Sequence, residues 1–170
     1  MDNIKVLISE EKLQKRIKKL AKEIEKDYKD KEINLICILK GSIMFTCDLA
    51  RNINKNVMID FLRVSSYENN KSKTISFVKG LLPDIKGKDI ILIEDIIDSG
   101  KTMNFLVPLL NNMKPNSIKV CTLLDKPSRR KMSFKADYVG FTIEDKFVLG
   151  YGMDYDQKYR NLKFIGYIEK

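Results

Sequence analysis

A run of apolar residues that ends in two acids and a glycine-containing loop constrains this chain more than any other segment. Ile90–Ile93 are four uncharged, mostly β-branched residues, which predict a buried strand. Glu94 and Asp95 follow at the end of that strand, and Asp98-Ser99-Gly100-Lys101-Thr102 leads into a predicted helix. Such a loop offers backbone N–H groups, hydroxyls and a helix N-terminus to an anion. The two acids suit sugar hydroxyls or a magnesium ion. The segment therefore predicts a ribose phosphate site in an α/β fold.

An ATP-binding loop and an ordinary turn are the alternatives for this segment. The Walker A pattern requires glycine five residues before its Gly-Lys pair, and Asp95 stands at that position. A strand-turn-helix with solvated acids would explain the turn residues alone. It does not explain why three acids and a hydroxyl-rich glycine loop follow a buried strand together.

The composition favours one domain and excludes several kinds of chemistry. A length of 170 residues suits a single domain, and its 44% hydrophobic content is enough for a core. No apolar run approaches the roughly 20 residues of a membrane span, and Met1–Lys5 lacks a signal-peptide pattern. We therefore expect a cytoplasmic protein without a membrane partner. The chain has no histidine, so proton transfer is left to Asp, Glu, Lys or Tyr.

The cysteines and the net charge add two exclusions. The three cysteines lack C-x-x-C spacing, which argues against a disulfide framework and against zinc. The formal charge of +9 comes mainly from lysines interleaved with acids, without an arginine-rich arm. An anionic substrate explains this balance as well as a nucleic acid would, and we expect no nucleic-acid partner.

Hydrophobic periodicity predicts alternating strands and helices. The expected order is helix 10–28 with Ser9 as N-cap, strand Ile33–Leu39, a helix that Ser42 caps and that runs to about Ile53, strand Val57–Val64, polar Ser65–Lys73, an edge strand over Thr74–Val78, strand Asp89–Glu94, helix Lys101–Asn112 and strand Ile118–Leu124. The order β-α-β-β-β-α-β indicates an α/β fold with a mainly parallel central sheet flanked by helices.

Two features of the expected fold concern function. Shorter strands over Tyr138–Phe141, Phe147–Val148 and Phe164–Ile168 are expected to form a small cap with residues 1–8. Residues 1–170 would then be one domain whose hood consists of about 1–8 and 140–170. Ligands of parallel sheets bind beyond the carboxyl ends of the strands. The polar residues that follow the strands, Lys40-Gly41, Ser65-Ser66-Tyr67, Glu94-Asp95 and Asp125-Lys126, should therefore gather on one edge.

With these loops placed, Glu94–Thr102 resembles the phosphoribosyl-pyrophosphate motif of the type I phosphoribosyltransferases. From about Lys5 to Ile168 the chain is similar to bacterial-type hypoxanthine (hypoxanthine-guanine) phosphoribosyltransferases. The other motifs that carry this resemblance are Leu39-Lys40-Gly41-Ser42, Val64-Ser65-Ser66-Tyr67, Leu124-Asp125-Lys126-Pro127, Asp145–Tyr155 and Tyr159-Arg160-Asn161-Leu162. The resemblance implies the type I fold with a hood, assembly as a homodimer or homotetramer, and a role in purine salvage. The implied reaction is Mg²⁺-dependent transfer of ribose 5-phosphate from phosphoribosyl pyrophosphate (PRPP) to a 6-oxopurine, which yields inosine or guanosine monophosphate and pyrophosphate.

The resemblance also implies roles for residues that would bind PRPP. Ser99, Gly100, Lys101 and Thr102 would hold the 5′-phosphate. Glu94 and Asp95 would hold the ribose hydroxyls near one Mg²⁺. Lys40 and Gly41 would form the pyrophosphate loop, and Arg160 would add a charge. Asp98 would be the general base beside the purine N7, with an N-cap of the following helix as the structural alternative.

A second group would bind the purine. Lys126 would donate to the 6-oxo group and so select against adenine. Phe147 would stack on the base, although its pattern alone indicates a core position. Val148 would pair with the base through its backbone, and Asp154 would border it and bind a second Mg²⁺. Ser66 and Tyr67 would belong to a lid.

Two departures and two alternatives accompany the resemblance. Ser99 stands where the family usually has Thr, and Glu68 where bacterial relatives often have Gly. A regulator that binds PRPP without chemistry is one alternative, but it would not need Lys126, Phe147 and Asp154. An enzyme that prefers another base, such as xanthine, is the second.

Overall fold

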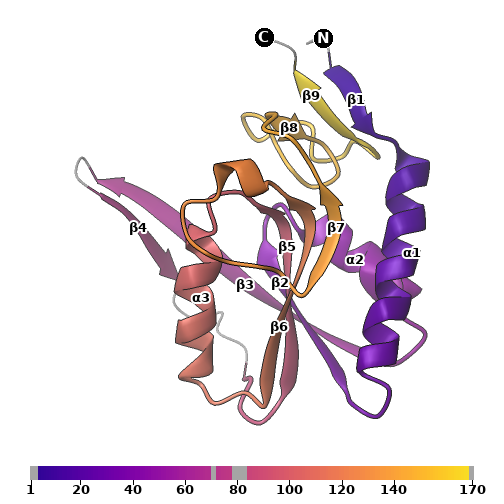
Figure 1. Ribbon diagram of the computed structural model, residues 1–170, viewed down its shortest axis with the longest axis vertical. Coiled ribbons are helices and arrows are strands. Elements are labelled where there is room, and N and C mark those ends of the chain that lie inside the picture. Colours follow the sequence, from indigo (N-terminus) through magenta and orange to yellow (C-terminus); the bar gives the residue numbers. More distant parts are fainter. Residues whose placement is uncertain (1–3, 70–71, 78–83, 169–170) are drawn as a thin grey trace.

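The central sheet of the computed structural model contains six strands (Figure 1). The structure describes residues 4–69, 72–77 and 84–168, and the side chains of residues 4–64 and 84–168. The strand order is β4-β3-β2-β5-β6-β7, and β4 alone is antiparallel to its neighbour. The strands are β2 (Ile33–Leu39), β3 (Val57–Asn69), β4 (Ser72–Phe77), β5 (Asp89–Ile97), β6 (Ser117–Asp125) and β7 (Tyr138–Thr142).

Helices cover both faces of this sheet, which explains the continuous apolar runs of its inner strands. In β2, Leu35 joins the core beneath α1 (Glu10–Asp27) and α2 (Ile43–Asn52), while Ile36 joins the core beneath α3 (Lys101–Asn111). Figure 1 shows α1 and α2 on one side of the sheet and α3 on the other. Successive side chains of a strand point to opposite faces, so both must be apolar here.

The first helix begins as its sequence predicts. Ser9 is the N-cap of α1, and its Oγ accepts a hydrogen bond from Lys12 N at 3.4 Å. Glu10 and Glu11 occupy the first turn, where carboxylates are stabilised by the helix dipole. The buried face of α1 consists of Leu13, Ile17, Leu20, Ala21 and Ile24.

A second, three-stranded sheet lies above the carboxyl ends of the parallel strands (Figure 1). It contains β1 (Ile4–Ile8), β9 (Ile165–Ile168) and β8 (Val148–Leu149), all antiparallel. The prediction that β7 belongs to this cap is wrong, because β7 pairs in parallel with β6 and forms the last strand of the central sheet. The burial of Tyr138 among the residues beneath α1 explains its place there.

The chain after β2 also differs from the prediction in one place. Ser65–Lys73 was expected to be a polar segment between strands, but β3 continues to Asn69 and pairs with β4 in an antiparallel hairpin. Backbone hydrogen bonds between two strands do not require an apolar run in either of them. Hydrophobicity therefore did not reveal that β3 extends over Ser65–Asn69. Ser66 and Tyr67 lie in β3, and their side chains are outside the described set. The predicted edge position of Thr74–Val78 is confirmed for β4, while Val78 lies outside the described residues.

None of the helices in the described part of the chain has the length and apolar composition needed to span a membrane.

Candidate active site

The loop after β5 forms a small cavity at the N-terminus of α3. Its volume is about 80 Å³, and its walls include Glu94, Asp98, Ser99, Gly100 and Thr102. Gly100 is the N-cap with φ of 80°, and a Cβ there would lie 2.9 Å from Met132 O. Glycine is therefore required both by the conformation and by the space. Lys101 is exposed and is the first residue of α3, so it contributes its backbone to the loop. The unpaired N–H groups of the first turn make this cavity suitable for an anion.

Residues after β6 hold this loop in place, and sequence reasoning missed them. Arg130 Nη1 donates to Asp98 O at 2.7 Å and to Ile97 O at 3.1 Å. Arg130 Nη2 also pairs with the Asp125 carboxylate. The backbone N–H groups of residues 131 and 132 donate to Ser99 O at 3.0 and 3.1 Å. Nothing in the local pattern distinguished Arg130 from the other cations of this lysine-rich chain.

Glu94, the first residue of the acid pair, lines the same cavity, and Asp95 follows it in β5. Glu94 is 8% exposed, and its burial, followed by the charge of Asp95, raises the pKa of its carboxyl group. Asp95 Oδ1 accepts a hydrogen bond from Ile96 N at 2.8 Å. The two carboxylates are hard oxygen donors, and Mg²⁺ commonly binds one or two carboxylates together with water and substrate phosphates. The pair thus fits Mg²⁺, although no described group of three or more acids, cysteines or histidines could hold a metal ion alone.

The loop after β2 packs directly on this acid pair. A Cβ at Gly41 would lie 1.6 Å from Asp95 Oδ2, so no larger residue fits without displacing the carboxylate. The peptide between Leu39 and Lys40 is cis. Ser42 occupies the N-cap position of α2, but its hydroxyl donates to Ile38 O at 2.7 Å. The prediction that its side chain caps this helix is therefore wrong.

The segment before β9 reaches the same loop. A Cβ at Gly152 would lie 2.1 Å from Gly41 O. Arg160 donates through Nη1 to Gly152 O at 2.7 Å, and its Nη2 forms an ion pair with Asp154 Oδ1 at 2.7 Å. Lys40 Nζ lies 3.3 Å from Gln157 Oε1 in the same cluster. The structure thus gathers Lys40, Gly41, Arg160 and Asp154, and it pairs Asp154 with a cation instead of with the other acids.

Asp98 does not cap α3, since Gly100 holds that position, so the alternative role for this acid is wrong. Arg129 Nε lies 3.4 Å from Asp98 Oδ1, yet this oxygen has no hydrogen-bond partner among the described residues. Arg129 also lies 3.5 Å from Asp145 Oδ1. The Asp98 carboxylate therefore lines the cavity with Arg129 beside it and with one buried oxygen that no described group hydrogen-bonds.

Lys126 and Phe147 lie on the hood side of the site. Lys126 is 4% exposed, its ammonium donates to Lys146 O, and it lies 3.8 Å from Asp145 Oδ1. Phe147 is 55% exposed and meets Tyr155 edge to face, with 5.6 Å between ring centroids. A core position for Phe147, which its pattern indicated, is wrong. Val148 is buried in β8 opposite Tyr167. An exposed aromatic ring and a fixed cation can contact a planar heterocycle.

Comparison with known proteins agrees with this geometry. The family model of the phosphoribosyl transferase domain matches residues 7–156. A hypoxanthine-guanine phosphoribosyltransferase of Bacillus subtilis is 48% identical over 97% of this chain and 93% of its own length. The chain belongs to the hypoxanthine-guanine phosphoribosyltransferase family.

Two further relatives of this family support the assignment. A hypoxanthine phosphoribosyltransferase of Escherichia coli K12 is 42% identical over 96% of the chain and 94% of its own length. A crystal structure of a hypoxanthine-guanine phosphoribosyltransferase from Bacillus anthracis superposes with a TM-score of 0.93 at 48% identity, and covers 98% of this chain and 100% of its own. The predicted type I phosphoribosyltransferase fold is confirmed.

Proposed function

We propose that this phosphoribosyltransferase transfers the 5-phosphoribosyl group of PRPP to N9 of hypoxanthine and of guanine. The products would be the corresponding monophosphates and pyrophosphate, as in purine salvage. The observation that carries this proposal is the contact of Gly41 with the Asp95 carboxylate, where a Cβ would have only 1.6 Å. This contact supports the proposal because it brings the loop predicted to bind pyrophosphate against one of the two acids predicted to hold the ribose.

The donor would bind along this wall. Ser99, Gly100, Lys101 and Thr102 would hold the 5′-phosphate at the start of α3. Glu94 and Asp95 would hold the ribose hydroxyls. The pyrophosphate would lie against Lys40, Gly41 and Arg160.

Mg²⁺ would be held by Glu94 and Asp95, with Asp154 as the acid nearest a second ion. When bound, Mg²⁺ supplies positive charge that neutralises the pyrophosphate leaving group.

The acceptor would bind on the hood side. Lys126 would donate to the 6-oxo group, Phe147 would stack on the ring, Val148 would pair through its backbone, and Asp154 would border the base. The N9–C1′ bond forms as the bond from C1′ to the pyrophosphate oxygen breaks. Asp98 would accept the proton that the purine loses at N7, because its Oδ1 has no hydrogen-bond partner among the described residues.

Three broader features belong to the same proposal. The hairpin of β3 and β4, with Ser66 and Tyr67, would close over the bound substrates as a lid. The enzyme would act in the cytoplasm as a homodimer or homotetramer. Its positive charge would serve anionic substrates, not a nucleic acid.

A direct assay tests the reaction. The purified chain is incubated with PRPP, Mg²⁺ and each of hypoxanthine, guanine, xanthine and adenine, and nucleotides are separated by chromatography. We expect inosine and guanosine monophosphates, no adenosine monophosphate, and no product in excess chelator. PRPP binding without turnover of any base would indicate a regulator instead, and xanthosine monophosphate as the main product would contradict the base preference.

A further inference from the structure

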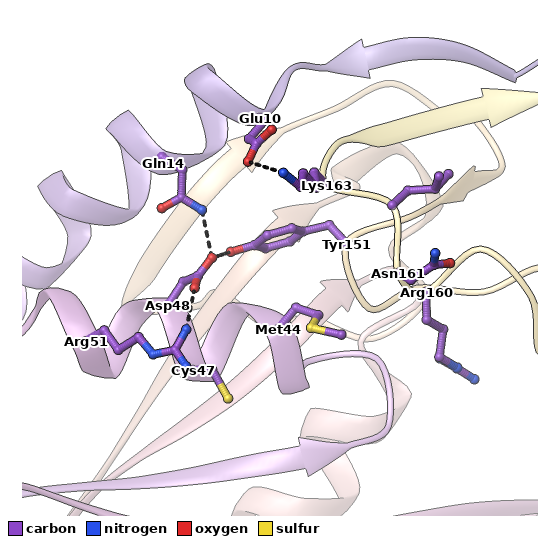
Figure 2. A pocket seen from close by; sticks show the side chains of 11 residues that line it. Glu10, Gln14, Met44, Cys47, Asp48, Arg51, Tyr151, Arg160, Asn161 and Lys163 are labelled. Carbon is purple, nitrogen blue, oxygen red and sulfur yellow. Dashed lines mark hydrogen bonds and ion pairs between the residues drawn. The ribbon is translucent and has the colours of Figure 1, made fainter.

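The backbone reverses sharply at Gly150-Tyr151-Gly152, where the hood meets the pyrophosphate loop. All three residues have positive φ, at 93°, 49° and 101°. A side chain is strained in this region, so a tyrosine between two glycines needs a compensating contact. Gly152 faces the active site through its contact with Gly41 O. Tyr151 points the other way and is 5% exposed, between α1 and α2 (Figure 2).

The buried phenol of Tyr151 ends in a polar network whose other members are partly or fully exposed. Its hydroxyl donates to Asp48 Oδ2 on α2, and Gln14 Nε2 on α1 donates to the same oxygen at 2.7 Å. Arg51 Nη1 lies 3.7 Å from the other oxygen of Asp48. Burial and the neighbouring Asp48 charge raise the pKa of Tyr151, so the phenol stays protonated and keeps donating. One carboxylate therefore ties the turn to two helices, as Figure 2 shows.

A cavity of about 270 Å³ lies beside the network, and Tyr151, Asp48 and Arg160 are among the residues that line it (Figure 2). The same cavity thus borders both the hydrogen bond of Tyr151 and the arginine of the proposed donor site.

The network ends at Tyr151, and the next residue, Gly152, contacts Gly41 and Arg160 of the proposed donor site. Gly152 N donates to Arg160 O at 2.9 Å, and Gly152 O accepts from the guanidinium of the same arginine. Gly152 also backs onto Gly41, which leads into α2, the helix that carries Asp48. Asp48 is thus connected to both residues of this contact. It is connected to Gly41 through α2, and to Gly152 through its hydrogen bond with Tyr151.

We infer that the Tyr151–Asp48 hydrogen bond positions Gly152 on Gly41, and so holds Arg160 and the loop after β2 in register for a diphosphate. Tyr151 and Asp48 are positioning residues, because neither contacts the reacting atoms. This inference rests on the proposed function and adds a distant anchor to it.

The chain offers a matched control for the test. Tyr138 is also a buried tyrosine whose hydroxyl donates to a helix carboxylate, Asp27 Oδ2, at 2.7 Å. Its hydrogen bond connects β7 to α1, and Tyr138 is not among the residues proposed for the donor site. Tyr138→Phe therefore removes the same kind of hydrogen bond elsewhere in the fold, and reports the cost of that loss to stability alone.

The experiment compares Tyr151→Phe, Asp48→Asn, the double variant and Tyr138→Phe. We expect Tyr151→Phe to raise the KM for PRPP by roughly tenfold, since small misplacements of binding groups are costly, and to leave the KM for hypoxanthine within about twofold. Asp48→Asn keeps an acceptor oxygen and should lie nearer to wild type, and its effect should not add to that of Tyr151→Phe. Tyr138→Phe should lower Tm without changing the KM for PRPP.

Binding of inorganic pyrophosphate with Mg²⁺, measured by calorimetry, separates this inference from the proposed reaction. Weaker pyrophosphate binding in Tyr151→Phe supports the anchor even if wild-type protein turns over no purine. Equal pyrophosphate binding and equal KM for PRPP in Tyr151→Phe and Tyr138→Phe would overturn the anchor, while wild-type turnover left the reaction intact.

Discussion

At the scale of single residues, Asp98 differs from the neighbouring acids in what its carboxylate contacts. Asp95 accepts a backbone hydrogen bond, and Glu94 is buried against Asp95. Asp98 Oδ1 has a cation at 3.4 Å but no hydrogen-bond partner among the described residues. Asp98 thus has a cation beside it and an oxygen that no described group hydrogen-bonds, which distinguishes it from Glu94 and Asp95 and supports the proposal that it contacts the purine.

Asp98→Asn should lower kcat by roughly 10²–10⁴-fold, because an amide cannot accept the purine proton and general-base catalysis contributes that much. PRPP affinity should change little, since the backbone of residues 98–100 still forms the loop. Steady-state kinetics with direct binding measurements checks both numbers. Wild-type turnover in this variant would assign the proton to another group.

Lys126→Ala should weaken catalysis with hypoxanthine by about 1.5–3 kcal/mol, the range for a hydrogen bond to a charged group. Discrimination against adenine should relax, because the buried cation no longer faces the exocyclic amino group. The measurement is kcat/KM for hypoxanthine and for adenine, with the exposed Lys135→Ala as control. An unchanged ratio between the two bases would show that Lys126 does not select the purine.

At the scale of elements, the phosphate loop depends on a segment that follows the next strand. Arg130 bonds two of its carbonyl groups, and the backbone of residues 131 and 132 bonds a third. The loop is therefore held between α3 and the turn after β6. Its shape should persist without a ligand, so the anion site is formed before the donor arrives.

Arg130→Lys should raise the KM for PRPP by about 10- to 100-fold, since lysine keeps the charge but not the forked donors that reach two carbonyl groups and Asp125. Arg129→Lys is the matched control, because Arg129 is half exposed and its side chain contacts the carboxylates of Asp98 and Asp145 at 3.4 and 3.5 Å, with no hydrogen bond to a carbonyl group of the loop among the described residues. Its effect on the same KM should stay within a few fold. Equal effects of the two substitutions would mean that charge, not the carbonyl contacts, orders the loop.

Local patterns predicted the elements and contacts that are local in the chain. The apolar run Ile33–Leu39 became β2 with the same bounds, and Ser9 caps α1. Glu94, Asp98, Ser99, Gly100 and Thr102 line one cavity because they lie close together in the chain around a strand end. Strands were predicted on both sides of Ser65–Lys73, but the extension of β3 to Asn69 and its pairing with β4 were missed, because backbone pairing leaves little trace in hydrophobicity. Tyr151 and Asp48 are 103 positions apart, so only the packing of α1 and α2 against the hood reveals their contact.

At the scale of the whole molecule, the burial of Glu94 lowers the free energy of unfolding. Glu94 is buried beside Asp95, so its ionised form is disfavoured and its pKa is raised in the folded chain. An acid whose pKa is higher when folded binds protons more strongly in the native state. Its unfavourable contribution is absent below the unfolded pKa of about 4.3 and grows as the pH rises toward the folded value. The role proposed for Glu94 and the stability of the fold therefore conflict at this residue.

Glu94→Gln should raise the Tm of the metal-free protein, by an amount corresponding to about 0.5–2 kcal/mol, while lowering activity strongly. The gain should be small near pH 4, where Glu94 is protonated, and larger near pH 8. Thermal unfolding at both pH values with chelator present measures it. A gain that is equal at the two pH values would mean that ionisation of Glu94 is not its source.

The sheet above the active site also affects the order of events during synthesis. Ile4 pairs with Ile168, so the backbone N–H and C=O groups of β1 cannot form their hydrogen bonds to β9 until β9 has been synthesised. The strands that carry the phosphate loop and Lys126 are complete well before that point. A growing chain can therefore form the loop after β5 before β9 has been made, while β8 still lacks the strand with which it pairs. A variant truncated before β9 should therefore still bind phosphate at the loop after β5, and should no longer bind the purine on the hood side.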